Sequence, residues 1–502
     1  RSNLDLVLDD DLGKPDYFDV FTELNVQLSS NQRLSINALY ADDAVRVITE
    51  NDPEELEQSD SDTTNTHAWI SLESDWTPGL SSRTTLSWSR LENHRVAEVN
   101  DPERMVARLL DTRETEIFGF QQDWSFDAFS DHFLRWGIGA RSERAEFDYR
   151  GVAEYYEFFE FYPGIDNPTV RAVEADPDGH SYSLYLSDRW QLTDRTGLEL
   201  GLRWDRQTYT EPDQDNQLSP RASLMHTLGE ATELRATWGR YYQSQAIQDL
   251  QVEDGQDHYF APQRADHWIV GIQHRFGEGY RLRTEGFYKR YDRLKPRFEN
   301  LFDPLVLIPE LAPDRVRLEP DHARAYGIET TLEYRGGAEL NWWASYTWSK
   351  AYDRIDGANQ DRSWDQRHAL QAGVAWERGP WQIGLALNVH SGWPTTGMGL
   401  ERLPVEPEEE DDDDYIVLPV PGERNAEQLG TFAQIDFRVS REFEVNRGRL
   451  SAFFEVSNLT NRDNPCCIDY DLDEDDDGEL VLDRAVEHWL PIIPAIGVLW
   501  EF

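Results

Sequence analysis

The segment at residues 198–205, LELGLRWD, decides the fold of this chain. Its apolar residues, Leu198, Leu200, Leu202 and Trp204, occupy every second position, and polar residues or glycine fill the positions between them. A two-residue period is typical of a β-strand with one apolar and one polar face. The same alternation recurs in residues 328–334, 340–349, 381–390 and 434–440. The sequence therefore predicts an all-β protein.

The connections between these runs are short at one end and long at the other. Short turns rich in Gly, Pro, Asp and Asn lie at 77–80, 193–195, 229–232, 277–279, 336–339, 378–380 and 446–448. Long polar insertions lie at 49–65, 150–178, 245–264, 300–321, 401–427 and 463–484. This asymmetry describes a transmembrane antiparallel up-and-down β-barrel, and the runs predict about twenty strands.

Composition excludes several other classes of protein. The 502 residues carry 48 Lys and Arg against 96 Asp and Glu, a net charge of −48, which excludes general nucleic-acid binding. Aromatic residues make up 12%, too many for a disordered acidic chain. The mean hydropathy of −0.69 is low for a membrane protein. A wide barrel explains it, because only the outward face of such a wall must be apolar.

The last strand carries the most specific single signal. Apolar residues at alternate positions from Leu490 to Phe502 share one face, and the final residue of that run is aromatic. Gly497, Trp500 and Phe502 form a Gly-x-x-aromatic-x-aromatic pattern, which we interpret as a barrel-assembly terminal signal. A free apolar strand would promote aggregation, so we expect it to close a barrel against the first strand. An ordinary buried terminal strand is the alternative.

Several short motifs resemble the barrel domain of TonB-dependent outer-membrane receptors. They are Arg324-Ala325-Tyr326-Gly327-Ile328-Glu329, Tyr346-Thr347-Trp348-Ser349-Lys350-Ala351-Tyr352-Asp353, Asp365-Gln366-Arg367-His368, Ser391-Gly392-Trp393-Pro394-Thr395-Thr396 and Ser457-Asn458-Leu459-Thr460-Asn461. Their order and spacing, with the terminal Phe502, carry the resemblance over essentially the whole chain. It implies a receptor that captures a scarce ligand with external loops and imports it through a plugged barrel.

The resemblance also implies partners and a location. These are outer-membrane lipid and lipopolysaccharide of a Gram-negative bacterium, the barrel-assembly machinery, the TonB complex and a plug domain. Family members have twenty-two strands and a plug before the barrel. In this sequence Arg1 is followed almost directly by an alternating run at residues 4–8. We therefore expect residues 1–502 to be a barrel domain without its plug and first hairpin. A plug-free passive porin and a soluble halophilic all-β binding protein are the alternative functions.

An acidic segment near the C-terminus offers a candidate calcium site. Asp473, Asp475 and Asp477 precede Gly478 in a D-x-D-x-D-G pattern, and Asp469 and Asp471 add further carboxylates. Carboxylate oxygens are the ligands that Ca²⁺ prefers, but position twelve is an arginine instead of the usual glutamate. The alternative is a solvated acidic loop without an ion.

The two cysteines, Cys466 and Cys467, are adjacent in the sequence. Their Cα atoms are about 3.8 Å apart across a trans peptide, so a vicinal disulfide would be strained. An outer-membrane loop lies in an oxidising compartment, and we expect either that disulfide or two free thiols.

Charged residues are also expected inside the barrel. Alternation places Arg203, Arg235 and Arg438 on the inner face, where pairing with Glu199, Asp205 and Asp436 predicts ion-pair ladders. It also places His368 and His390 on that face. No nucleophile motif, zinc-binding helix or phosphate-binding glycine loop is present in the sequence, so we do not expect an enzyme.

Overall fold

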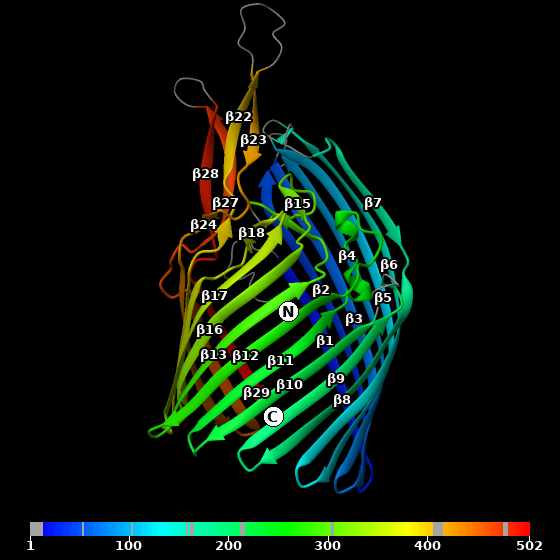
Figure 1. The fold of residues 1–502 in the computed structure, drawn as a ribbon. Coiled ribbons are helices and arrows are strands. Elements are labelled where there is room, and N and C mark those ends of the chain that lie inside the picture. The colour runs from blue at the N-terminus through cyan, green and yellow to red at the C-terminus, as the bar shows by residue number, and fades with distance from the viewer. Residues whose placement is uncertain are drawn as a thin grey trace, which may run out of the picture.

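The computed structural model describes residues 14–52, 55–101, 104–156, 159–160, 165–210, 216–302, 306–404, 415–474 and 480–501. One antiparallel sheet of 21 strands forms the body of the protein, and its tilted strands curve around as the wall of a barrel (Figure 1). No helix in these residues is long and apolar enough to cross a membrane.

Nineteen of the 21 strands form the wall, and two shorter ones, β7 and β18, lie beside it at the loop end. The wall strands are β1 (Lys14–Ser29), β2 (Gln32–Asp52), β3 (Glu55–Thr77), β4 (Leu80–Asp101), β5 (Met105–Phe129), β6 (His132–Tyr155), β8 (Asp178–Thr193), β9 (Thr196–Gln207), β10 (Gln217–Leu228), β11 (Thr232–Gln243), β12 (Gln263–Phe276), β13 (Tyr280–Asp292), β16 (His322–Tyr334), β17 (Leu340–Ile355), β19 (His368–Arg378), β20 (Trp381–His390), β25 (Phe432–Val445), β26 (Gly448–Ser457) and β29 (Ile493–Glu501). The short strands are β7 (Thr169–Ala175) and β18 (Ala358–Asp361).

The two faces of the wall differ as the alternation predicted. Leu186 of β8 lies directly opposite Leu202 of β9, and both side chains are about half exposed on the outer face. The adjacent Arg203 faces inward, where its guanidinium lies 2.6 Å from Asp205. An apolar outer face and a charged inner face are the arrangement of a membrane-spanning barrel. The predicted all-β up-and-down fold is therefore confirmed.

Aromatic rings gather near the short turns. Trp124 stacks between Trp76 and Trp136, with ring centroids 5.9 and 6.0 Å apart. Farther around the wall, Tyr280 lies 5.4 Å from Phe276 and 4.7 Å from Tyr334. Amphipathic rings favour the level of the lipid headgroups, so these positions mark one border of the apolar band.

Two expected insertions are largely strand. Residues 49–65 were expected to form a polar loop, but β2 continues to Asp52 and β3 begins at Glu55. Likewise, β6 continues to Tyr155 and β7 occupies part of the 150–178 segment. The reason is that ladder hydrogen bonds use the backbone alone, so a hairpin that extends into water can be polar on both faces.

The first and last strands of the sheet would have to pair for the barrel to close. β29 pairs with β26, placing Gly497 opposite Phe453, and the indole of Trp500 donates to the Arg447 carbonyl oxygen at 3.2 Å. Within the described residues no ladder joins β29 to β1. The expected strand at residues 4–8 and the terminal Phe502 lie outside those residues, so closure and the terminal assembly signal stay predictions.

The loop end of the barrel carries four small two-stranded sheets. They are β14 (Arg297–Asn300) with β15 (Arg315–Leu318), β21 (Pro394–Thr395) with β24 (Glu427–Gln428), β22 (Met398–Pro404) with β23 (Tyr415–Pro421), and β27 (Pro465–Glu474) with β28 (Leu480–His488). The hairpins β22–β23 and β27–β28 among them project beyond the wall in Figure 1. Buried apolar side chains gather at this end, between the loops and the inner face of the wall.

Candidate functional site

Loops fold inward at the loop end and pack against the wall. The connection from β11 to β12 carries the short helices η5 (Ile247–Asp249) and η6 (Val252–Asp254). Leu311, from the connection between β13 and β16, is buried in the same cluster as Tyr149 of β6. The hydroxyl of Tyr155 donates to the Leu311 carbonyl oxygen at 2.8 Å. Each buried apolar side chain contributes about 1.5–3 kcal/mol, which is enough to hold these loops in place.

Ion pairs fix η6 to both the wall and a neighbouring loop. The fully buried carboxylate of Asp254 accepts from Nε and Nη2 of Arg315 at 2.9 and 2.7 Å. Glu253 lies 2.8 Å from Arg113 of β5. A two-pronged guanidinium–carboxylate contact fixes orientation as well as distance. These contacts hold the loops in one defined arrangement.

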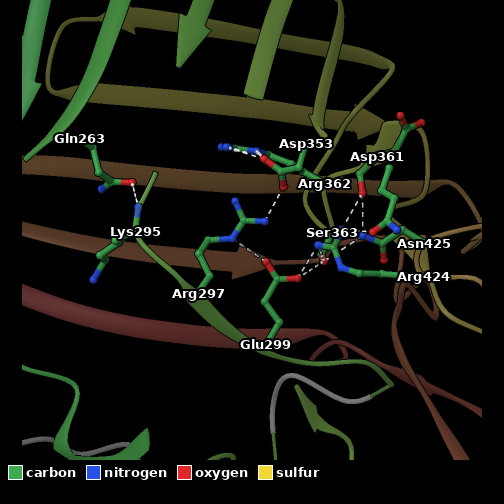
Figure 2. A network of polar contacts seen from close by, with 11 residues as sticks. Gln263, Lys295, Arg297, Glu299, Asp353, Asp361, Arg362, Ser363, Arg424 and Asn425 are labelled. Carbon is green, nitrogen blue, oxygen red and sulfur yellow. Dashed lines mark hydrogen bonds and ion pairs between the residues drawn. The ribbon is translucent and has the colours of Figure 1, made fainter. Parts of the chain in front are cut away.

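A second polar network joins three of the segments at the loop end (Figure 2). Asp353, at the loop end of β17, accepts from Nε and Nη2 of Arg362 at 3.0 and 2.9 Å and also from Arg297 of β14. Glu299 accepts from Arg297 at 3.1 Å and from Arg424 at 2.5 Å. The hydroxyl of Ser363 donates to Glu299 at 3.0 Å. The alternating chain of carboxylates and guanidiniums spreads charge across the loops.

Asp353 is the centre of this network. Its side chain is fully buried. Burial alone would raise the pKa of the Asp353 carboxyl, but the hydrogen bonds and charges of Arg297 and Arg362 outweigh it and hold that pKa below its ordinary value. Asp353 is therefore an anion at neutral pH, with both arginines as its partners.

Two cavities lie among these loops. The smaller, of about 240 Å³, is bordered by four aromatic rings and several polar groups. The larger, of about 530 Å³, lies between the tips of β3 and β4 and the β27–β28 hairpin. The smaller cavity is lined by Phe298, Glu299, Asn300, Leu301, Phe302, Pro309, Arg315, Ser363, Trp364, Trp393, Pro394, Thr395, Asn425, Leu429 and Cys466. Apolar walls with a few directed polar groups are typical of small-molecule sites.

One donor at the smaller cavity lacks a partner. The indole Nε1 of Trp393 is buried and has no hydrogen-bond acceptor in the described part of the chain. The ring is held by Trp364, 4.7 Å away edge to face, and by His390, 5.1 Å away. A buried N–H without an acceptor costs about 1–3 kcal/mol. A bound group with an acceptor atom would remove that cost.

The predicted calcium ligands are only partly within the described residues. Asp469 pairs with Arg104 at 3.1 Å and also accepts from the backbone of Tyr470. Asp471 and Asp473 belong to β27, but their side chains lie outside what is described. Asp475 and Asp477 lie entirely outside the described residues. Calcium binding stays a prediction, although Asp469 is engaged by an arginine.

Cys466 and Cys467 are both buried, and both are reduced thiols in the structure. The Cys467 thiol donates to a carboxylate oxygen of Glu487 on β28, at 3.3 Å. Their oxidation to a vicinal disulfide stays a prediction. Sequence reasoning did not find Glu487, because its approach depends on how β28 pairs with β27.

The inner face carries part of the expected ion pairing: Arg203 pairs with Asp205 as predicted, at 2.6 Å. Arg438 pairs with Glu455 at 3.0 Å instead of with Asp436. His390 is buried and stacks on Phe432 at 4.7 Å. The inward placement of His368 was wrong.

His368 lies on the outer face because it is the register partner of Trp348, whose side chain is exposed. The His368 ring also contacts the hydroxyl of the exposed Tyr346 at 2.7 Å.

The central network of Figure 2 was missed by sequence reasoning. Its five charged members come from three segments of the chain that follow no common spacing: Arg297 and Glu299 lie on β14, Asp353 and Arg362 lie at the end of β17 and shortly after it, and Arg424 lies between β23 and β24. The one available signal was the motif at residues 346–353, which ends at the central carboxylate.

Comparison with known proteins supports the fold and identifies the family. FpvA of P. aeruginosa, in its complex with a heterologous pyoverdine and iron, is similar over 98% of this chain, with a TM-score of 0.64 and 12% identity, and the chain spans 65% of its length. The ferric-catecholate import receptor Fiu of E. coli K12 is similar over 97% of this chain and 74% of its own, with a TM-score of 0.63 and 14% identity.

The copper transporter OprC is similar over 90% of this chain and 67% of its own, with a TM-score of 0.62 and 14% identity. No curated protein matches the chain by sequence. A family model described as "TonB dependent receptor-like, beta-barrel" matches residues 8–459. The chain therefore belongs to the family of TonB-dependent receptor-like β-barrels.

Proposed function

We propose that this chain is the barrel of an outer-membrane receptor that captures a scarce small ligand at its loop end and imports it with energy delivered by TonB. The observation that carries the proposal is the site around the unpartnered indole of Trp393, at a cavity of about 240 Å³. Short turns face the periplasm and long loops face outward in barrels of this kind. The cavity then lies where a ligand arrives from outside.

The family and the apolar outer face support a Gram-negative outer-membrane location. The same outer face argues against the soluble halophilic alternative, because half-exposed leucines such as Leu186 and Leu202 need an apolar environment. TonB, a plug domain, lipopolysaccharide and the barrel-assembly machinery are the partners that we propose from family membership. The similar structures are described as receptors or transporters for iron chelates or copper, which supports a transport role without naming this chain's ligand.

The cavity suggests the general chemistry of the ligand. The rings of Phe298, Trp364 and Trp393 offer apolar faces, while the Trp393 indole offers a hydrogen-bond donor. We propose a compact ligand with a flat or apolar surface and at least one exposed acceptor oxygen. Loop residues set specificity in such folds, so the shared fold does not fix the compound.

Retention of a native compound tests the capture step. The natural full-length protein, purified in detergent, is incubated with an extract of spent culture medium, washed, and analysed for retained small molecules by mass spectrometry. We expect one compound class to be retained, and Trp393→Phe to reduce retention about tenfold, as expected for the loss of one hydrogen bond of about 1.5 kcal/mol. The outward-facing Trp348→Phe is the control. No retained compound would contradict the receptor proposal.

Uptake tests the energy requirement. Cells that express the natural gene receive the retained compound in isotope-labelled form, with and without an uncoupler of the inner-membrane proton gradient. We expect uptake to stop with the uncoupler. Uncoupler-insensitive uptake, together with steady ion conductance in a planar bilayer, would instead support the passive porin.

A further inference from the structure

Two adjacent cysteines on one strand normally project to opposite faces, but in β27 they do not. The β27–β28 register passes from Pro465 opposite His488 directly to Cys467 opposite Glu487, so Cys466 is an extra residue in the ladder. Such a β-bulge redirects a side chain that regular pairing would turn away. The result is that Cys466, Cys467 and Glu487 each place a ligand atom within 4.8 Å of the others.

We propose that Cys466, Cys467 and Glu487 form a binding site for a thiophilic divalent cation of the Zn²⁺ class. Two thiolates and one carboxylate match the ligand preferences of Zn²⁺, whereas Ca²⁺ and Mg²⁺ require oxygen ligands. With bonds of about 2.3 Å to sulfur and 2.0–2.2 Å to oxygen, tetrahedral ligand atoms are about 3.5–3.8 Å apart. The observed separations therefore require side-chain shifts of only about 1 Å to close on the ion.

The surroundings of the three ligands suit this role. Cys466 and Cys467 are 7% and 1% exposed, whereas Glu487 is exposed, so the site is shielded on one side and accessible on the other. The base of the hairpin is fixed by the buried Asn464, whose side chain accepts from the backbone of Ala433 at 2.8 Å. A net charge of −48 favours the approach of cations to the protein.

Binding of the metal ion replaces the proton of each thiol with a bond to the metal. In the structure the Cys467 thiol donates a hydrogen bond to a carboxylate oxygen of Glu487 at 3.3 Å. On binding, each thiol loses its proton to solvent and forms a bond to the metal, and the carboxylate of Glu487 supplies an oxygen as the third ligand. No electron is transferred. The fourth tetrahedral position stays open to water or to a group of a bound molecule.

The proposed metal site lies between the two cavities of the loop end. Cys466 lines the cavity of about 240 Å³ and Glu487 lines the cavity of about 530 Å³. A metal ion held between them would present its open coordination position where molecules enter the barrel. The site goes beyond the proposed transport function, and it stands or fails independently of uptake.

Titration with Cd²⁺ tests the proposal on the purified chain in detergent, kept reduced by a phosphine. We expect one Cd²⁺ per chain, seen as the ultraviolet sulfur-to-metal charge-transfer band, and competition by Zn²⁺. Cys466→Ser and Cys467→Ser should each abolish the band, while Glu487→Gln should weaken binding at least about tenfold, the lower end of losses seen even for outer-shell changes. Asp463→Asn, an exposed carboxylate on the same loop, is the matched control and should bind normally.

A second measurement needs no variant. Zn²⁺ should protect both cysteines of the unmodified chain from alkylation, as read by peptide mass spectrometry. The proposal is overturned if no stoichiometric Cd²⁺ band appears, or if binding persists in both serine variants. It is also overturned if the protein, isolated with thiols blocked and without reductant, carries a Cys466–Cys467 disulfide.

Discussion

A single carboxylate shows how charge is managed at the mouth of this barrel. Asp353 is fully buried, and an isolated buried carboxylate would shift its pKa upward and become neutral. Arg297 and Arg362 prevent this by supplying directed, charged donors. Because those arginines come from different connections, the same contacts that keep Asp353 ionised also hold the loops together.

Replacing Asp353 by Asn should therefore loosen the loops without unfolding the wall. Removing one partner of a buried ion pair costs about 3–5 kcal/mol, since the other charges lose their counter-ion. We expect amide hydrogen exchange in residues 293–302 and 359–364 to accelerate at least about a hundredfold, which corresponds to about 2.8 kcal/mol. Asp356→Asn, an exposed residue in the adjacent turn, is the control. Equal exchange in the two variants would contradict the central role of Asp353.

The lowered pKa of Asp353 predicts a loss of loop order in acid. Its pKa in the folded protein is below the unfolded value of about 3.9, so the stabilisation is present above that value and is lost as pH falls through the folded pKa. Limited proteolysis of the loops should be constant from about pH 7 to pH 5 and increase only below about pH 4. Asp353→Asn should remove this acid-dependent step. Loosening of these loops already at pH 6 would show that another group controls them.

At the scale of elements, the inward-folded loops depend on apolar packing. Leu311 is 1% exposed and reaches β6, where a Cβ placed on Gly151 would lie 3.2 Å from Leu311 Cδ2. Leu311→Ala should destabilise the loop by about 2–5 kcal/mol through lost packing and a residual cavity. We expect faster hydrogen exchange in residues 306–318 with an unchanged far-ultraviolet strand signal. Val152→Ala, on the outer face of β6, should change hydrogen exchange in residues 306–318 little. If it accelerated that exchange as much as Leu311→Ala does, the packing role of Leu311 would be contradicted.

The strands themselves were largely predictable from the sequence. The alternating runs at residues 198–205, 328–334, 340–349, 381–390 and 434–440 lie within β9, β16, β17, β20 and β25, because the two faces of each of these strands meet different environments. The alternation of apolar and polar residues is missing where both faces of a strand meet water. Residues 49–65 lie beyond the apolar band, so polar side chains on both faces resembled a loop although the backbone ladder continues.

The candidate site was less predictable, for a related physical reason. Asp353 and Arg424 are 71 positions apart in the sequence and belong to the same network only because their loops fold into the mouth. The Cys466–Cys467 pair was visible in the sequence, but its position opposite Glu487 depends on a one-residue bulge. Pairing register on that scale is set by tertiary context and not by local pattern.

For the whole molecule, the net charge of −48 and the membrane location are compatible because charge and apolar surface are spatially separated. Within the apolar band, charged side chains such as Arg203 and Asp205 face inward and pair with each other. Outward positions such as Leu184 and Leu186 are apolar and about half exposed. This separation makes the stability of the wall sensitive to which face receives a charge.

Adjacent substitutions on β8 should therefore have very different effects. Leu186→Arg places a guanidinium in the middle of the apolar band, where it costs about 2–4 kcal/mol. Ser187→Arg adds the same side chain one residue later, on the charged inner face near Arg135 and Gly201, and should cost less than about 1 kcal/mol. Unfolding by urea in lipid vesicles, followed by tryptophan fluorescence, measures both. If Ser187→Arg destabilised the protein as strongly as Leu186→Arg, the outer face would not be facing lipid, and the transport proposal would lose its structural basis.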